Sequence, residues 1–141
     1  MEIDRDLIER KLGDIKGALI ELRRITGKGK EEFLSNVYLR YAAKYLLITA
    51  IEAAFSVCNH IAVRRGRVPG SYSECFTELS RLGIISRELA EKLSRMAKFR
   101  NLLVHQYWRI DDERVFEILE KDTSDFEEFI REVMAYVEGR D

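Results

Sequence analysis

A short stretch of the chain, positions 100 to 107, combines side chains suited to acid-base and phosphate chemistry. It contains Arg100, His105 and Tyr107, with Asn101 directly after the arginine. Histidine exchanges a proton near neutral pH, and the guanidinium of arginine binds phosphoryl oxygens in a bidentate manner. The intervening residues are mostly apolar, and burying an arginine and a histidine among them costs several kcal/mol unless partners offset it. This stretch is therefore the candidate functional site.

The spacing within the stretch limits which side chains can act together. On a continuous helix, Arg100 and Tyr107 project from nearly the same face, and Asn101 and His105 share another face. Arg100 and His105 are separated by roughly 140°, taking 100° per residue. They can converge on one ligand only if the helix ends or distorts nearby, or if a second subunit contributes.

Each of these residues also has a structural explanation. Arg100 can form a buried ion pair with Glu52, and His105 can be a hydrogen-bonded residue in the core or at a helix end. Tyr107 can be a core aromatic with a satisfied hydroxyl group. The residue types alone leave both explanations open.

Helices must position these side chains, because apolar residues recur at steps of three and four and the chain contains one proline. We predict helices over about residues 3–25, 31–64, 71–82, 86–107 and 111–137. Ser71 or Ser73 is expected to cap the third helix, Gly83 to end it, and Ser86 to start the fourth. Short connections favour an all-α, up-and-down antiparallel bundle of about five helices in a single domain, residues 1–141.

The helix predicted over residues 86–107 carries apolar surface around most of its circumference. The residues responsible are Phe99, Leu102, Leu103, Val104 and Trp108. Such a helix is buried on more than one side. A second copy of the chain can cover the extra face in a symmetric homodimer, and a helix that is central within the monomer is the alternative.

Composition indicates a globular protein, with 46% hydrophobic and 35% charged residues. Cys58 and Cys75, with only two histidines, fit neither a disulfide framework nor a zinc site, so we expect a cytoplasmic location and no metal or cofactor. The apolar stretch 41–63 includes Lys44 and Glu52, which are costly in a bilayer, so we predict a core helix and no membrane span.

Charge is unevenly distributed, although the formal net charge is −1. Residues 81–109 contain seven basic side chains and two acidic ones, whereas residues 111–141 contain twelve acidic and four basic ones. The first segment has the sign that a phosphate ligand requires, and the second can face a basic partner. Solvated helix faces produce the same pattern, so the charge alone does not decide.

The chain resembles the HepT-like family of the HEPN superfamily. Arg100, His105 and Tyr107 form its Arg-x-x-x-x-His-x-Tyr pattern, and the polar Asn101 also fits. Further matching motifs are Glu52, Asn59-His60, Pro69-x-x-Tyr72-x-x-x-Phe76, Leu82-Gly83-Ile84-Ile85 and Met96-x-x-Phe99-Arg100-Asn101. The resemblance covers roughly residues 31–120, and the remainder matches only in helical character.

The resemblance implies a homodimeric toxin ribonuclease of a type VII-like toxin-antitoxin system. Two copies of the motif would face a shared cleft and cut RNA without a metal ion. His105 would take the proton of a ribose 2′-OH, its copy in the second subunit would protonate the leaving oxygen, and Arg100 would bind the phosphoryl oxygens. Tyr107 would be the residue to which a cognate minimal nucleotidyltransferase antitoxin attaches AMP.

Other polar residues are candidates for supporting roles. Glu52 can orient Arg100 or form an intrahelical pair, and His60 can line the cleft or be an ordinary helix-end histidine. Basic residues that can bind RNA or the antitoxin, or simply be solvated, are Arg64, Arg65, Arg67 and Lys98.

A different class of function is a non-catalytic HEPN dimer that binds nucleotides or docks a nucleotidyltransferase through the same cleft, because the fold alone does not determine activity. The presence of both Arg100 and His105 favours the enzyme, since a scaffold has little use for a buried basic pair. A helical transcription factor is disfavoured, because the sequence contains no helix-turn-helix spacing.

Overall fold

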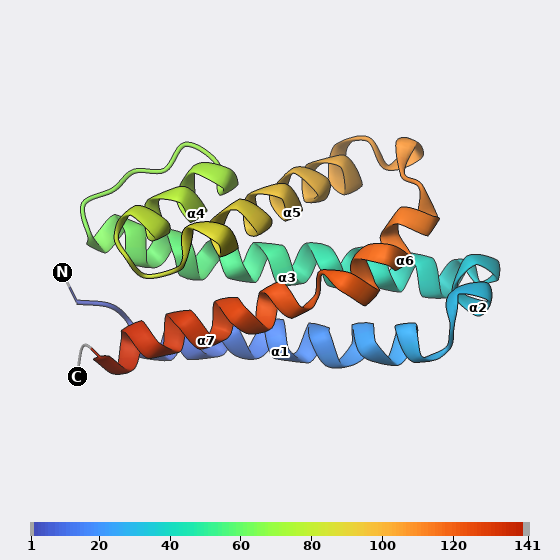
Figure 1. Ribbon diagram of the computed structural model, residues 1–141, viewed down its shortest axis with the longest axis horizontal. Coiled ribbons are helices and arrows are strands. Elements are labelled where there is room, and N and C mark those ends of the chain that lie inside the picture. The colour runs from blue at the N-terminus through green and yellow to red at the C-terminus, as the bar shows by residue number, and fades with distance from the viewer. Residues whose placement is uncertain (1, 140–141) are drawn as a thin grey trace.

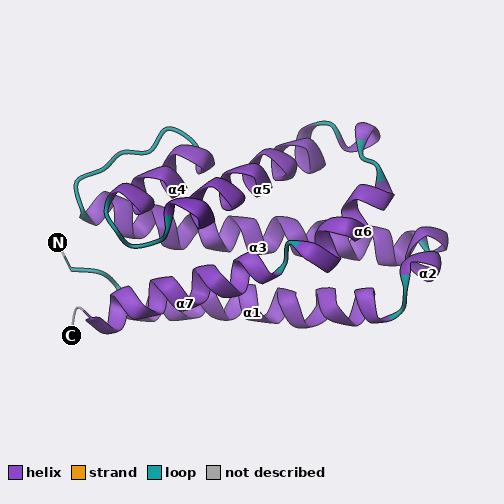
Figure 2. Ribbon diagram, viewed as in Figure 1, coloured by secondary structure: helices purple, strands orange, loops and turns teal. Residues whose placement is uncertain are grey.

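The computed structural model describes residues 2–139 as helices joined by short loops (Figures 1 and 2). Its elements are α1 (Arg5–Gly27), α2 (Lys30–Ser35), α3 (Val37–Arg64), α4 (Tyr72–Arg81), α5 (Arg87–His105), the 3-10 turn η1 (Tyr107–Arg109), α6 (Asp112–Lys121) and α7 (Ser124–Gly139). These residues contain no strand, so the all-α prediction is confirmed.

The long helix α3 lies in the middle of the molecule. α1 and α7 lie on one side of it and α4 and α5 on the other, and both chain ends lie at the same end of the bundle (Figure 1). By length and hydropathy alone, α3 is a candidate membrane span. However, it buries Ala43, Leu47, Ala54, Val57 and Ile61 against its neighbours. It is therefore a core helix, as predicted.

Two predicted helices are each divided, so the prediction of five helices is wrong: the described residues form seven α-helices. Within 31–64, the side-chain oxygen of Asn36 accepts the backbone N–H groups of Tyr38 at 2.9 Å and Leu39 at 3.3 Å and starts α3. Within 111–137, α6 ends at Lys121 and α7 begins at Ser124.

The starts of α4 and α5 and the end of α4 agree with the sequence. Ser71 accepts the backbone N–H of Glu74 at 3.1 Å, and Ser86 accepts that of Leu89 at 3.1 Å. Gly83 follows α4 with a φ of 77°, a left-handed conformation that favours glycine. Local side-chain chemistry thus determines where both helices begin and where α4 stops.

α4 departs from the predicted up-and-down pattern. Tyr72 stacks on Phe55 with ring centroids 4.0 Å apart, and one turn later the thiol of Cys75 contacts that of Cys58. These contacts advance in the same direction along both helices, so α4 runs parallel to α3. The loop over residues 65–71 makes this possible by carrying the chain back along α3 (Figure 1).

Two basic residues of α3 fix the start of α6. The Nε of Arg40 lies 3.3 Å and the Nζ of Lys44 lies 2.8 Å from the carboxylate oxygens of Asp112. All three side chains are partly buried, so salt screens these pairs less than it screens exposed ones. They anchor the chain shortly after η1.

Candidate active site

The sequence motif lies at the C-terminal end of α5. This helix ends at His105, because Gln106 has a φ of −138° and a ψ of 44°, which is not helical. The single 3-10 turn η1 then begins at Tyr107. The predicted helix end near Tyr107 is therefore wrong, and Tyr107 does not share the helix face of Arg100. The motif spans a helix end and the turn after it.

Arg100 is held by neighbours from three helices. Its Nη2 donates to the carboxylate of Glu52 on α3 at 2.9 Å, and its Nη1 donates to the side-chain oxygen of Asn101 at 3.1 Å. Its guanidinium also lies over the ring of Tyr72 on α4, 5.0 Å from the centroid. Only 16% of the Arg100 side chain is exposed, compared with 47% of Glu52. The Glu52 pair is thus between helices, not within one.

Tyr72 is itself held in place beneath the guanidinium. Its ring stacks on Phe55 at an interplanar angle of 10°. A cation over an aromatic face contributes about 0.5 to 2 kcal/mol, with the larger values in desolvated sites. The sequence placed Tyr72 in a motif but gave no sign of this contact, because it depends on the parallel course of α3 and α4. The Nε of Arg100 is buried without a hydrogen-bond partner among the described residues, so one N–H is unused by the fold.

His105 and Tyr107 are both exposed in the single chain. Tyr107 is 68% exposed and packs edge-on against Trp108, with ring centroids 5.4 Å apart. Within residues 2–139, no hydrogen bond or ion pair joins Arg100, His105 and Tyr107 to one another. One chain therefore supplies a fixed arginine and an exposed histidine that do not contact each other.

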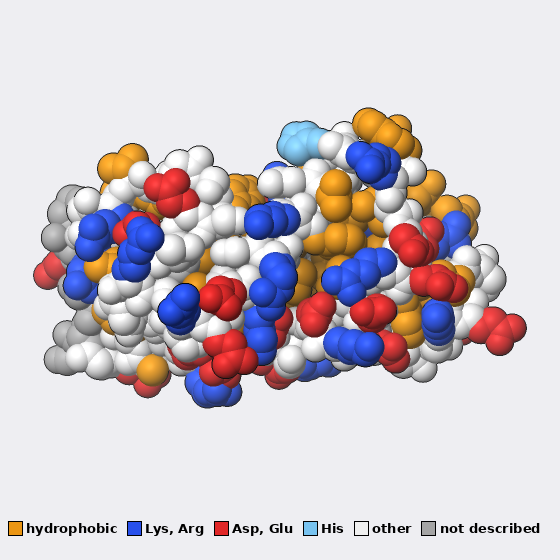
Figure 3. All heavy atoms as spheres, turned by 45° about the horizontal axis from the view of Figure 1, so that its top comes forward, with side chains coloured by type: hydrophobic (Ala, Val, Ile, Leu, Met, Phe, Trp, Pro, Cys, Tyr) orange, Lys and Arg blue, Asp and Glu red, His pale blue; other side chains and the backbone are white. Residues whose placement is uncertain are grey.

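Large hydrophobic side chains are exposed toward the same end of the bundle. They are Leu102, Val104, Tyr107 and Trp108 at the end of α5 and in η1, and Tyr38, Tyr41 and Tyr45 on the first half of α3. Figure 3 shows hydrophobic side chains at this end, beside a histidine. The end of α5 is thus not covered within one chain, which argues against the alternative of a helix that is central in a monomer. Exposed apolar patches mark interaction surfaces.

Arg64, Arg65 and Arg67 lie at the end of α3 and in the loop after it, toward the end of the bundle where the chain termini lie (Figure 1). They bind other parts of the fold: Arg64 donates to the carbonyl of Glu2 at 3.0 Å, Arg65 to the hydroxyl of Tyr136 at 3.1 Å, and Arg67 lies 3.6 Å from the carboxylate of Glu78. The structure does not bring these arginines to Arg100.

His60 also contributes to the fold and not to the motif. Its Nε2 accepts the backbone N–H of Asp4 at 2.8 Å and so joins the start of α1 to α3. Burial lowers the pKa of His60, and the charge of Arg64 lowers it further. A neutral imidazole can accept this hydrogen bond, whereas a protonated one cannot. The helix-end alternative for His60 is the one observed.

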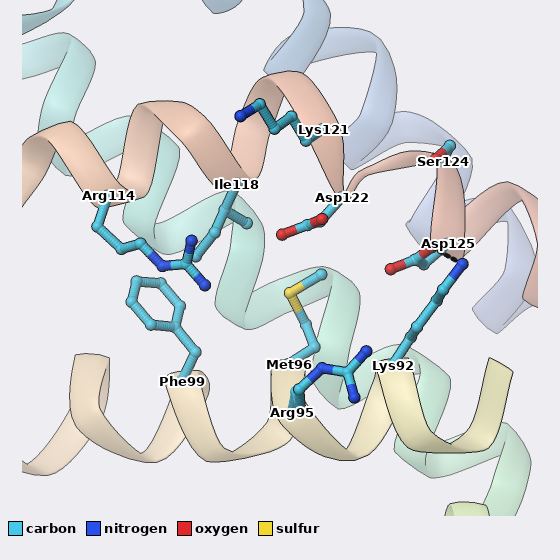
Figure 4. A pocket seen from close by; sticks show the side chains of 10 residues that line it. All are labelled: Lys92, Arg95, Met96, Phe99, Arg114, Ile118, Lys121, Asp122, Ser124 and Asp125. Atoms are coloured by element: carbon cyan, nitrogen blue, oxygen red, sulfur yellow. Dashed lines mark ion pairs between the residues drawn. The ribbon is translucent and has the colours of Figure 1, made fainter. Parts of the chain in front are cut away.

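Two hollows flank α5. One lies between α5 and the α6–α7 segment, where Arg95 points toward the side of Asp122 and Asp125, and Lys121 also lines it (Figure 4). Burial raises the pKa of Asp125, and nearby Lys92, 3.9 Å away, opposes that rise. The other hollow lies between α4 and α5 and is predominantly basic; Lys98 lines it. Lys98 therefore lies on the motif helix, apart from the three arginines that follow α3.

Comparison with known proteins gives consistent results. The family model described as "Ribonuclease HepT-like" matches residues 15–133. The mRNA nuclease HepT of Shewanella oneidensis is 28% identical over 131 residues, covering 92% of this chain and 98% of that protein. The tRNA nuclease HepT of Aphanizomenon flos-aquae is 26% identical over 137 residues, covering 96% and 92%. The solved structure of a tri-AMPylated Shewanella oneidensis HEPN toxin in complex with MNT antitoxin superposes with a TM-score of 0.87 at 27% identity, covering 92% of this chain and 98% of that one.

Proposed function

This chain belongs to the HepT-like ribonuclease family, and we propose that it is an endoribonuclease that cuts RNA in a cleft shared by two copies of the chain. The observation that carries the proposal is the arrangement at the end of α5. There Arg100 is held by Glu52 and Tyr72, and the helix then ends at an exposed His105. A fixed cation beside an accessible acid-base group suits phosphoryl chemistry on a large substrate.

The proposed reaction is an internal phosphoryl transfer. Neutral His105 removes the proton of a ribose 2′-OH, and that oxygen attacks the adjacent phosphorus. The bond from phosphorus to the 5′ oxygen breaks, and a protonated His105 of the second copy donates a proton to the leaving oxygen. The products are a 2′,3′-cyclic phosphate and a 5′-hydroxyl. Acid-base help of this kind contributes roughly 100- to 10,000-fold.

Arg100 stabilises the phosphoryl oxygens as negative charge builds on them. Glu52 and Tyr72 hold its guanidinium in position, and Asn101 accepts from the same group. In water, the molecules around a phosphoryl group must reorient as negative charge builds on it, which costs free energy. A guanidinium that the fold already holds in position avoids most of that cost. We assign these three residues as positioning residues.

The second copy of the chain completes the site. Arg100 and His105 diverge by roughly 140° on a regular helix, and a symmetric dimer can bring the histidine of one copy toward the arginine of the other. Leu102, Val104 and Trp108 supply an exposed apolar surface at the same place. A two-fold interface uses the same patch on both subunits, so it would set two motifs face to face.

Regulation would act at Tyr107. In the proposed step, its phenolic oxygen attacks the α-phosphorus of ATP held by a cognate nucleotidyltransferase antitoxin, the phenolic proton is released, and pyrophosphate leaves. An exposed fraction of 68% gives the partner access to this residue. The attached AMP would add bulk and negative charge to the shared cleft, and both would hinder an RNA phosphate from entering it. The chain would thus be the cytoplasmic toxin of a type VII-like toxin-antitoxin system.

The test is RNA cleavage by purified protein, free of antitoxin and of AMP, in the presence of EDTA. We expect cleavage with 2′,3′-cyclic phosphate ends, and we expect DNA of the same sequence to survive because it lacks the 2′-OH. His105→Ala should lose most of the activity. A requirement for magnesium, or undiminished cleavage by His105→Ala, would contradict the proposal.

A further inference from the structure

The hollow between α4 and α5, called the α4–α5 groove from here on, has the charge of a nucleic-acid-binding surface. Its basic residues are Arg81, Arg87, Arg95 and Lys98, and Glu91 is the acidic one among the described residues that line it. Ser73, Thr77, Ser80 and Ser94 also line it, and the hydroxyl groups of Ser73, Thr77 and Ser94 donate to backbone carbonyls of the fold. The clustered cations match the phosphates of a nucleic-acid strand.

Of these cations, Lys98 is free to bind a ligand, Arg95 also faces Asp125 in the other hollow, and Arg81 and Arg87 are paired with carboxylates. Arg81 pairs with Glu78 at 2.7 Å and Arg87 with Glu91 at 3.4 Å, each within one helix turn and with an exposed arginine. The Arg87–Glu91 pair is exposed on both sides and contributes about 0 to 1 kcal/mol, so a phosphate can replace that carboxylate. Glu78 is only 13% exposed, so water and salt screen its pair with Arg81 less, and Arg81 is less available. Arg95 and Lys98 are exposed and form no ion pair within the described residues.

The groove's lining ends at Lys98, and the same face of α5 leads on from there to the motif. Lys98 and His105 are seven residues apart on one helix, so they point within roughly 20° of the same direction and lie about 10 Å apart along the axis. Ser94 and Asn101 share this face, because they stand one turn before Lys98 and one turn before His105. Figure 3 shows Lys and Arg side chains across the middle of the molecule, below the histidine visible there, with Asp and Glu side chains among them.

We propose that the α4–α5 groove binds the sugar-phosphate backbone of the RNA strand next to the bond that is cut, and so guides that strand to His105. The inference deepens the proposed function and depends on it. Among the described residues that line it, the groove offers cations for phosphates but no Asn or Gln side chain that could hydrogen-bond to the bases. Its affinity for RNA should therefore depend little on the RNA sequence. The hollow on the other side of α5 is also lined by basic residues, but it has two carboxylates, Asp122 and Asp125. Two of its cations are already in ion pairs, Lys92 with Asp125 and Arg114 with Glu117, so it is less suitable for phosphates.

The test measures binding separately from cleavage. Fluorescence anisotropy follows a labelled single-stranded RNA on protein carrying His105→Ala, at several salt concentrations. The logarithm of the association constant falls as the logarithm of the salt concentration rises, with a slope of roughly −0.7 for each phosphate contact of a single strand. Adding Arg95→Ala and Lys98→Ala removes two contacts, so the slope should become shallower by about 1.4. The same counterion release predicts that, at roughly 0.1 M salt, the groove variant binds the RNA about 25-fold more weakly than protein carrying His105→Ala alone.

A matched control removes the same charge elsewhere. Lys16→Ala with Lys28→Ala neutralises two exposed lysines, on α1 and directly after it, and should leave slope and affinity nearly unchanged. Circular dichroism melting checks that both double variants fold. An unchanged slope for the groove variant would overturn the inference and assign the basic face to an acidic protein partner. An equal loss in the control would overturn it too. Failure of the wild type to cut RNA would instead count against the proposed function.

Discussion

Removing the carboxylate of Glu52 should weaken RNA cleavage without touching any group that meets the substrate. Glu52→Ala leaves the Nη2 of Arg100 without its acceptor at 2.9 Å, while the contact with Tyr72 remains. The guanidinium then samples orientations that do not face the phosphate. Glu52→Gln keeps a side-chain oxygen that can accept from the same N–H, so most of the activity should return.

The size of the effect follows from the exposure of the pair. A hydrogen bond to a charged group contributes about 1.5 to 3 kcal/mol in mutational series. Because Glu52 is 47% exposed, solvent screens the pair, and we take about 1 kcal/mol as its value. That corresponds to roughly a five-fold lower kcat/KM for Glu52→Ala, together with a similar decrease in the free energy of unfolding.

The assay is steady-state cleavage of a fluorophore-quencher RNA, with thermal melting of each variant. Glu117→Ala is the matched control, because Glu117 pairs with Arg114 at 2.8 Å on α6 and is 48% exposed. We expect it to cleave RNA like the wild type. If Glu52→Ala also cleaved like the wild type while Arg100→Ala was inactive, Arg100 would not depend on Glu52 for its orientation. Equal losses in Glu52→Ala and Glu52→Gln would mean that charge, not orientation, is the contribution.

Light scattering after size-exclusion chromatography should show a dimer for the wild type and a monomer for Leu102→Asp with Trp108→Asp, whose side chains form the exposed apolar patch; a wild-type monomer at micromolar concentration would rule out the shared cleft. Intact-mass spectrometry after incubation with the antitoxin and ATP should show AMP-sized additions on the wild type but not on Tyr107→Phe, which should stay folded; equal modification of both would refute Tyr107 as the acceptor. Burial lowers the pKa of His60 in the folded protein, so as the pH falls below about 6.5 this histidine takes up a proton in the unfolded chain before it does so in the folded one. The free energy of unfolding therefore decreases in that range of pH. Calorimetry from acidic to neutral pH should show that His60→Gln, which can still accept the Asp4 N–H, lacks this part of the pH dependence, and an identical profile would show that His60 is not responsible.

The sequence was most informative where local chemistry decides the structure. Ser71 and Ser86 cap helices as predicted, because each supplies its oxygen to a backbone N–H three residues later. It was least informative about breaks inside long periodic segments. Asn36 is a good capping residue, but the apolar repeat continues past it and hid the break. The break between α6 and α7 contains neither glycine nor proline.

Within the site, the sequence left open whether Glu52 pairs with Arg100 or within its own helix, and it gave no indication of the surroundings of that pair. The parallel course of α4, which brings Tyr72 beneath Arg100, depends on the path of a loop and has no local signal. The sequence did not indicate which side chains of this stretch are exposed in a single chain, because the apolar neighbours suggested burial on more than one side, partly against a second copy. The local helix end was predicted two residues too late, which changes the direction of Tyr107.

The pairs that Arg40 and Lys44 make with Asp112 have a consequence for the segment between α5 and α6. The last turn of α5 anchors the start of this segment, and the ion pairs of Asp112 with Arg40 and Lys44 anchor its end. The fold therefore restrains the segment from both sides. A group attached to the exposed ring of Tyr107 would extend into solvent or toward a neighbouring subunit, and the bundle beneath would keep its packing. Attachment and removal should therefore proceed on the native protein, with no unfolding step to slow a return to activity.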